Sequence, residues 1–244
     1  MKHAMAMTKN LRLFMGAVDA LMHRDIGTEG MGLLWGDPGQ GKSTAVAYTV
    51  NAMDGVYVRA IGSWTVTSML GTIAQELGGH RMLRRADMIT YICQQLAQNP
   101  RPVFIDEADY LFRQLEMLDS LRDIYDISGC PVILVGMEDI ARRLQNHGRF
   151  ARRVTQWVEF QGIDLDDARI VADTCCDIHI ADDLLQHLHG VTAGNIGRQI
   201  VALTKIERMA KSSALDQVGL QQWGDRPLFY DQPVFGKNSK KRGA

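Results

Sequence analysis

The chain has 244 residues, 46% of them hydrophobic, and a formal net charge of -1. This length allows one full domain with a small appendage. The nearly balanced charge excludes a protein that binds polyanions through its overall charge, so contact with nucleic acid would need local patches or several assembled copies. The four cysteines (Cys93, Cys130, Cys175, Cys176) form no Cys-x-x-Cys pair, no apolar stretch approaches the ~20 residues of a membrane span, and the N-terminus shows no signal-peptide pattern. We therefore expect reduced thiols, a cytoplasmic location and no membrane contact.

The N-terminal stretch has the periodicity of a helix. Apolar residues recur at helical spacing between Thr8 and Arg24, which predicts an amphipathic helix that packs on the following domain. We assign residues 1–27 to this N-terminal region.

Five short apolar runs follow, and segments of helical periodicity separate them. The expected strands are Met31–Trp35, Val56–Arg59, Val103–Asp106, Val132–Val135 and Gln156–Phe160. The expected helices are Ser43–Met53, Ser68–Leu77, Ala86–Gln98, Leu111–Asp126 and Glu138–Asn146. This alternation predicts an α/β domain over residues 28–162, with a five-stranded parallel sheet between helices.

The most specific motif follows the first expected strand. A glycine-rich loop there leads directly into a helix, the context of a phosphate-binding loop, or Walker A motif. Its glycines let backbone N–H groups turn toward phosphate oxygens, and the helix N-terminus favours negative charge. We expect Lys42 to reach the β- and γ-phosphates of ATP and Ser43 to ligate Mg²⁺. The candidate nucleotide-binding residues are Gly36, Asp37, Pro38, Gly39, Gln40, Gly41, Lys42, Ser43 and Thr44.

Two carboxylates end the third expected strand, in Val103-Phe104-Ile105-Asp106-Glu107. At the carboxyl end of a parallel strand, Asp106 would hold Mg²⁺ directly or through water. Glu107 would polarise the attacking water. After a phosphate-binding loop, this pair predicts the second half of a hydrolytic nucleotide site.

Arginines precede the fifth expected strand, in Arg149-Phe150-Ala151-Arg152-Arg153. If the protein forms rings or filaments, this connection lies at a subunit edge, and one arginine would enter the neighbouring nucleotide site. Arg149 is the first choice and Arg152 the second. The alternative is a solvated basic turn.

The pattern changes after Phe160, because no further strand-like run appears. Asp164–Thr174, Ala181–His189 and Asn195–Met209 read as helices, with Asp164 as a plausible N-cap. They predict a small all-helical lid over residues 163–212. Arg198 at its last helix would contact the γ-phosphate or, alternatively, form a surface ion pair. Residues 213–244 read as a polar and basic tail, in which a Leu228–Tyr230 patch either folds back on the lid or docks a partner.

Together these motifs resemble the AAA+ ATPases over residues 28–210, with a Walker A motif, a Walker B motif, an arginine segment and a lid that carries Gly-Asn-x-x-Arg. Within that class the Phe-Ile-Asp-Glu-Ala-Asp-Tyr-Leu, Val-Ile-Leu-Val-Gly-Met-Glu-Asp and Gly-Arg-Phe-Ala-Arg-Arg stretches resemble the transposition ATPases of the phage Mu B, TnsC and TniB type. The resemblance implies an oligomeric ATPase that assembles on double-stranded DNA in a ring or filament and passes this target to a transposase.

Three arginines are the candidate DNA contacts. Arg81, Arg84 and Arg85 follow Gly78-Gly79-His80, and an assembly would repeat them in every protomer as a phosphate-binding stripe without sequence preference. The alternative for them is a solvated helix start. Two other functions also stay open: an ATPase of the ExeA type that acts on protein partners, and a nucleotide-gated switch with little turnover. Met137 favours the switch, because it replaces a polar residue that related ATPases often use to orient water.

Overall fold

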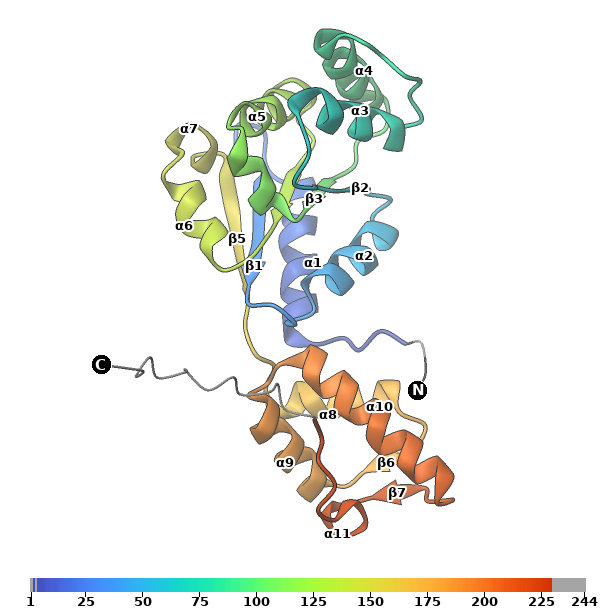
Figure 1. Ribbon diagram of the computed structural model, residues 1–244. Coiled ribbons are helices and arrows are strands. Elements are labelled where there is room, and N and C mark those ends of the chain that lie inside the picture. The colour runs from blue at the N-terminus through green and yellow to red at the C-terminus, as the bar shows by residue number, and fades with distance from the viewer. Residues whose placement is uncertain (1, 3, 230–244) are drawn as a thin grey trace, which may run out of the picture.

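A computed structural model describes residue 2 and residues 4–229 of the chain (Figure 1). Strands β1 (Met31–Gly36), β2 (Val56–Arg59), β3 (Val103–Asp106), β4 (Val132–Val135) and β5 (Val154–Phe160) pair in parallel in the order β2-β3-β4-β1-β5. The predicted five-stranded sheet is therefore confirmed, with β5 beginning at Val154 rather than Gln156. All five strands deliver their carboxyl ends to one edge of the sheet.

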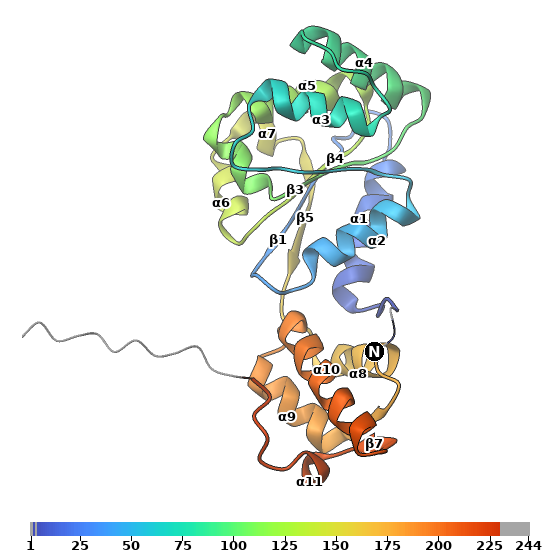
Figure 2. The same ribbon diagram turned by 45° about the vertical axis from the view of Figure 1, so that its right-hand side comes forward.

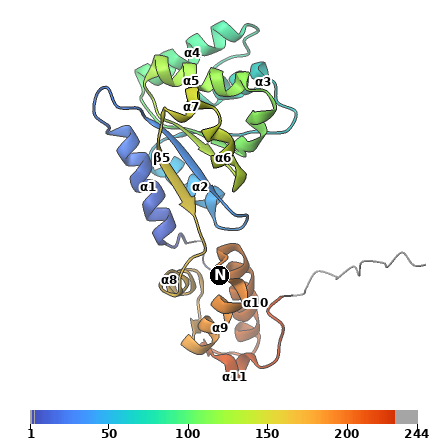
Figure 3. The ribbon, with the colours of Figure 1, turned by 90° about the vertical axis from the view of Figure 1, so that its left-hand side faces the viewer.

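Helices cover both faces of the sheet, because successive strand residues point to opposite sides. Leu34 and Phe104 lie in a cluster with helices α1 (Lys9–Met22) and α2 (Lys42–Ala52), and Phe14 of α1 packs edge-on against Phe104. The neighbouring residues Leu33 and Ile105 join the larger cluster on the other face. That face is covered by α3 (Val66–Glu76), α4 (Arg85–Gln98) and α5 (Glu116–Ser128), as Figure 3 shows.

The connections after β3 and β4 are more divided than the sequence predicts. The helix expected over Leu111–Asp126 is a 3₁₀ helix η1 (Ala108–Arg113) followed by α5, because Gln114 between them is extended. After β4 come α6 (Asp139–Gln145) and the one-turn helix α7 (Gly148–Ala151), of which α7 was not predicted. Phe150 anchors α7 in the core, where it is buried.

A second hydrophobic cluster is the core of the lid, which lies below the sheet in Figure 2. Its helices are α8 (Leu165–Cys175), α9 (Asp182–Thr192) and α10 (Ile196–Ser212). The Asp164 side chain accepts from the backbone N–H of Asp167 at 2.9 Å, which confirms it as the N-cap of α8. The predicted lid helices are therefore present.

The lid is not all helical, and it does not end at residue 212. Strand β6 (His179–Ile180) pairs in parallel with β7 (Gln217–Val218), and helix α11 (Leu220–Trp223) follows. Trp223 and Leu228 are buried in the lid cluster, so the polar tail expected from residue 213 is wrong for the described part of that segment. The error arose because isolated apolar residues in a polar sequence show no periodicity. The basic residues Lys240–Arg242 lie outside the described residues.

Other sequence expectations concern thiols and membranes. All four cysteines are buried and free. No helix among the described residues is long and apolar enough to cross a membrane.

The N-terminal segment joins the lid to the sheet domain. The backbone N–H of Lys9, at the start of α1, donates to both carboxylate oxygens of Asp167 at 3.1 Å. Asp167 is 2% exposed on α8, and the Lys9 ammonium pairs with Asp164. A buried carboxylate of the lid therefore satisfies a helix N-terminus of the sheet domain.

Asp167→Ala should lower the free energy of unfolding by about 1–2 kcal/mol, because the N–H of Lys9 loses a buried acceptor. Denaturant unfolding followed by circular dichroism measures this change. Asp166→Ala is the control, because that side chain is 86% exposed and should have little effect. Equal effects of the two substitutions would contradict the capping role.

Candidate nucleotide-binding site

A cavity of about 560 Å³ lies between the sheet edge, the lid and the N-terminal segment. Its polar end contains Lys42, Ser43, Asp106 and Glu107. Its other end is mainly apolar. Side chains from three separate parts of the chain line the apolar end: Met5, Ala6 and Leu11 before the sheet, Phe160 at its edge, and Val171, Cys175, Ile196 and Ile200 of the lid. Charged and apolar side chains therefore line the same cavity.

The glycine loop joins β1 to α2 at this polar end. Gly36 has a φ of +143°, and a Cβ there would lie 2.2 Å from the Phe160 carbonyl oxygen, so a larger residue would displace β5. Gly41, with φ +84°, is the N-cap of α2, a left-handed position that glycine adopts without strain. Of the predicted loop residues, Pro38 through Thr44 line the cavity, whereas Gly36 and Asp37 do not.

Lys42 is the first residue of α2 and folds back over the loop. Its Nζ donates to the carbonyl oxygens of Gly36 at 2.6 Å and Asp37 at 2.8 Å. Burial lowers the pKa of Lys42 below its ordinary 10.5, while the nearby carboxylates, Asp106 first among them, oppose this shift. The ammonium is thus partly desolvated at the mouth of the loop, where an anion would bind it strongly.

Asp106 is held rigidly at the end of β3. It is 5% exposed, and each carboxylate oxygen accepts one hydrogen bond: Oδ2 from the Tyr57 hydroxyl at 3.0 Å and Oδ1 from the Glu107 N–H at 2.9 Å. Burial, and then the charge of Asp106, raise the pKa of Tyr57 to about 12. Tyr57 therefore remains a proton donor at neutral pH and fixes the carboxylate.

Glu107 is held differently from its neighbour. Its backbone has a φ of +53°, an uncommon conformation for a side chain of this size. Its Oε1 accepts from the Arg59 guanidinium at 3.0 Å, and the Arg59 side chain is 64% exposed. Arg59 lies directly opposite Asp106 in the register of β2 and β3. An exposed ion pair at a strained residue thus restrains the second carboxylate.

Asp109 lies behind the cavity lining and contacts it through Met137. Its Oδ2 accepts from the backbone N–H of Met137 at 2.8 Å, which ties η1 to the end of β4. Met137 itself lines the cavity, so an apolar side chain faces the candidate site at the position where related ATPases often have a polar one.

The lid contacts the loop through the N-terminus of α10. Asn195, the N-cap, accepts from the Arg198 N–H at 3.0 Å and donates through Nδ2 to the Pro38 carbonyl at 3.0 Å. The Gly197 N–H donates to the Gly39 carbonyl at 2.8 Å. The lid and the glycine loop are therefore joined by two direct hydrogen bonds.

Arg198 lies beside the loop but directs its side chain elsewhere. Its guanidinium carbon is 4.5 Å from the ring centroid of Phe229, a cation–π contact. Arg198 is exposed and is not among the residues that line the cavity. The Leu228–Phe229 part of the C-terminal patch folds back on the lid, in agreement with the first of the two sequence alternatives, and Tyr230 lies outside the described residues.

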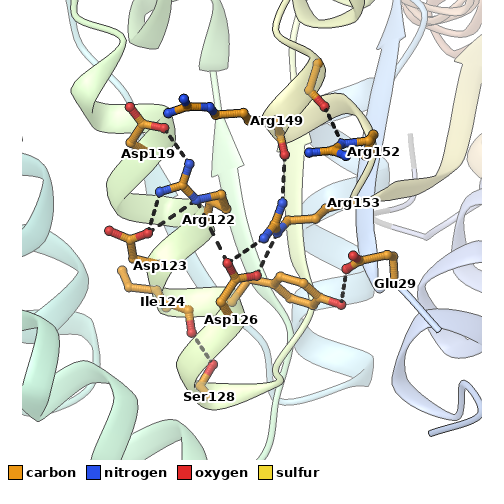
Figure 4. Close-up of polar contacts among 12 residues, drawn as sticks. Glu29, Asp119, Arg122, Asp123, Ile124, Asp126, Ser128, Arg149, Arg152 and Arg153 are labelled. Atoms are coloured by element: carbon orange, nitrogen blue, oxygen red, sulfur yellow. Dashed lines mark hydrogen bonds and ion pairs between the residues drawn. The ribbon is translucent and has the colours of Figure 1, made fainter. Parts of the chain in front are cut away.

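The remaining predicted arginines lie away from the cavity. Arg149 and Arg152 are exposed on and just after α7, and Figure 4 shows both side chains. Arg81, Arg84 and Arg85 are exposed where α3 is connected to α4, at the end of the molecule farthest from the lid (Figure 1). Arg85 also donates to the Thr67 hydroxyl at 2.9 Å and pairs with Glu116 at 3.6 Å.

The donor set at the polar end fits Mg²⁺. Ser43 and Asp106 line the same cavity, and each Asp106 oxygen has lone-pair capacity beyond its single hydrogen bond. Among the described residues no group of three or more His, Cys, Asp or Glu is arranged to hold a metal by itself.

Comparisons with known proteins agree with this geometry. Residues 24–144 match the family model described as an AAA domain. No curated protein sequence matches the chain significantly.

Solved structures share the AAA+ P-loop fold. One similar structure is the ORC2 protein of Aeropyrum pernix in ADPNP–ADP complexes, with a TM-score of 0.63 and 15% identity over 87% of this chain. Another is Cdc6p of Pyrobaculum aerophilum, with a TM-score of 0.64 and 15% identity over 89% of this chain. A third is the ORC1 protein of Aeropyrum pernix in complex with DNA, with a TM-score of 0.60 and 16% identity over 86% of this chain. The chain spans 64%, 66% and 61% of the length of these structures, respectively. At such identities the likeness concerns the fold.

Four contacts at this site were not predicted from the sequence: Tyr57 to Asp106, Arg59 to Glu107, Asp109 to Met137, and Asn195 to Pro38. Polar residues in the short strand β2 were the available signal for the first two, because Tyr57 and Arg59 interrupt an apolar run that pairs with β3. No local signal distinguishes Asn195 as a contact of the loop from Asn195 as a helix cap.

Asn195→Asp should separate the two roles of this side chain, as the N-cap of α10 and as the donor to Pro38. The aspartate keeps the cap acceptor but loses the donor to Pro38, so the unfolding free energy should stay near wild type while nucleotide release accelerates. Asn195→Ala should lose both, with about 1 kcal/mol of destabilisation. Stopped-flow displacement of a fluorescent ATP analogue and denaturant unfolding measure these effects. Unchanged release in both variants would rule out the lid contact as a restraint on nucleotide.

Proposed function

We propose that this protein is an ATPase that assembles with ATP on double-stranded DNA and delivers this target to a transposase, with hydrolysis driving disassembly. The observation that carries the ATPase part is the convergence of the glycine loop, Asp106 and Glu107 in one cavity that the lid contacts. The DNA and transposase parts rest on the sequence resemblance and on the exposed arginines.

Phosphates would be bound by groups that already converge. The backbone N–H groups of the loop and the N-terminus of α2 favour an anion. Lys42 would exchange the Gly36 and Asp37 carbonyls for β- and γ-phosphate oxygens. Ser43 and Asp106 would hold Mg²⁺, which when bound neutralises charge on the phosphates. The apolar side chains that line the cavity suit a nucleobase, because ligand pockets hold such groups mainly by hydrophobic contact.

Hydrolysis would use Glu107 as the residue that polarises water. Its ion pair with Arg59 competes with this role, because an acceptor engaged by a guanidinium is less available to water. Arg149, or secondly Arg152, would complete a neighbouring site in the assembly, and Arg198 would approach the γ-phosphate after leaving Phe229. Loss of the γ-phosphate would then remove the contacts that hold neighbours together.

DNA would be contacted at the connection between α3 and α4. Arg81 and Arg84 are exposed and have no ion pair among those found in the described part of the chain, whereas Arg85 is engaged by Thr67 and Glu116. We therefore assign Arg81 and Arg84 the larger share of phosphate contact. One copy offers little charge, but an assembly would repeat the pair in every protomer. The ORC1 protein of Aeropyrum pernix, which shares the fold, was solved in complex with DNA.

Arg59→Ala should raise the basal ATPase rate by up to about fivefold, because an exposed ion pair is worth about 0.2–1 kcal/mol and its loss frees Glu107. Steady-state phosphate release without DNA measures the rate. Arg59→Lys keeps a cation beside Glu107 and should stay near wild type. A fall in rate similar to that of Glu107→Gln would instead make Arg59 part of the hydrolytic machinery.

Duplex DNA should produce large particles with ATP, and Lys42→Ala should abolish them.

Arg81→Ala combined with Arg84→Ala should weaken DNA binding. The slope of log K against log[salt] should become shallower by about 2, because each arginine is expected to neutralise one phosphate. Light scattering and fluorescence anisotropy between low and high salt measure these effects. Arg12→Ala, an exposed arginine on α1, is the control.

The same measurements separate the alternatives. An ATPase rate indifferent to DNA, with no ATP-dependent particles, would favour action on protein partners in the manner of the ExeA type. Glu107→Gln without effect on the lifetime of bound nucleotide would favour a switch with little turnover. Addition of a transposase to DNA-bound assemblies tests the delivery step, because target capture should then require ATP.

A further inference from the structure

The arginine segment before β5 contains three arginines with different surroundings. Arg152 donates back to the Gly148 carbonyl at 3.2 Å. Arg153 is engaged by Asp126 and by the Arg149 backbone (Figure 4). The Arg149 side chain is exposed and has no hydrogen bond or ion pair among those found in the described part of the chain. Of the three, Arg149 is the guanidinium available to a neighbouring protomer.

Arg153 fixes the backbone that carries Arg149. Its Nε and Nη2 donate to the two carboxylate oxygens of Asp126 at 2.7 Å each, a bidentate pair that sets both distance and orientation. Its third nitrogen, Nη1, donates to the Arg149 carbonyl at 2.8 Å. One guanidinium therefore connects α5 to the residue that would act in trans.

The same residue attaches this turn to the central sheet. The Arg153 carbonyl accepts from the backbone N–H of Met31, the first residue of β1, at 2.9 Å. Strand β1 runs from there to the glycine loop. Asp126 also lies 3.9 Å from Arg122 Nε, and Arg122 pairs with Asp123 at 2.7 Å. The turn is thus held between α5 and β1.

A short turn needs such support. Helix α7 has a single turn, Gly148 begins it, and the only buried side chain of that turn is Phe150. The Arg149 side chain must nevertheless place its charge accurately, because misplacement by about 1 Å can cost about 100-fold in rate. The bidentate pair between Arg153 and Asp126 restrains both the distance and the orientation of the Arg153 guanidinium, which holds the Arg149 carbonyl.

The geometry points to Asp126, acting through Arg153, as a positioning residue for the arginine that Arg149 presents to the next protomer. This inference rests on the proposed function, since it requires an assembly in which Arg149 acts in trans. Asp126 does not touch the nucleotide cavity of its own protomer, for it is absent from the residues that line it. Its loss should therefore impair the neighbour's site and spare its own.

Mixed assemblies test this directional effect. Glu107→Gln protein serves as donor, with an intact arginine but no hydrolysis, and Arg149→Ala protein serves as acceptor, with an intact site but no arginine. Mixed on duplex DNA, they should hydrolyse ATP at least about tenfold faster than either alone, within the range by which arginine fingers accelerate hydrolysis. Asp126→Asn placed in the donor should remove most of this gain, whereas Asp126→Asn placed in the acceptor should leave it. Asp126→Glu in the donor, which keeps a carboxylate, should retain more of the gain than Asn.

Two comparisons keep the test decisive. Asp123→Asn in the donor is the matched control, because Asp123 pairs with Arg122 on the same helix and has no contact with Arg153 among the described ion pairs; it should preserve the gain. Equal losses from Asp126→Asn in donor and acceptor, or no loss in the donor, would overturn the positioning role while leaving the trans arginine intact. If the original mixture shows no gain although both proteins assemble, the trans arginine fails and the positioning role fails with it.

Discussion

The site depends on the parallel pairing of β1 inside the sheet, between β4 and β5. Because every strand runs in the same direction, the glycine loop after β1 and the carboxylates after β3 reach the same edge. Strand β4 lies between β3 and β1 and thereby sets the separation between Asp106 and the glycine loop. Changing the order or direction of these strands would separate the ammonium of Lys42 from the carboxylates that share its cavity, whatever the local sequence motifs.

The adjacent carboxylates of Asp106 and Glu107 differ in burial and in how firmly they are held. Asp106 is buried and accepts a hydrogen bond at each oxygen, so its position costs little further ordering when a ligand arrives. Glu107 is partly exposed, has a left-handed backbone and is held by an exposed, solvated arginine. A rigid group suits the binding of a cation, and a releasable group suits the handling of water. Neighbouring positions in one motif thus combine preorganisation with adjustability.

The sequence predicted those features that a local pattern encodes. Apolar runs located all five strands, glycine spacing located the loop, and Asp164 was identified as a cap. The contacts that escaped prediction join residues far apart: Tyr57 and Asp106 are separated by 49 positions, and Asn195 and Pro38 by 157. Strands β6 and β7, of two residues each, are too short for periodicity to reveal. The lid extends beyond residue 212 because Val218, Trp223 and Leu228 are buried in its hydrophobic cluster. Each is an isolated apolar residue in a polar segment, so the sequence shows no helical or strand periodicity there.

The hydrogen bonds from the Lys9 backbone N–H to Asp167 have a consequence for biosynthesis. The two partners are 158 positions apart, so at about 5–20 residues per second the ribosome would need roughly 8–30 s to deliver the second after the first. During that interval the leading segment, with Met5 and Ala6, has no lid to cover it. All five strands of the sheet are synthesised before the lid helices, so the cavity wall that the N-terminal segment shares with the lid is completed only after the sheet strands have been made.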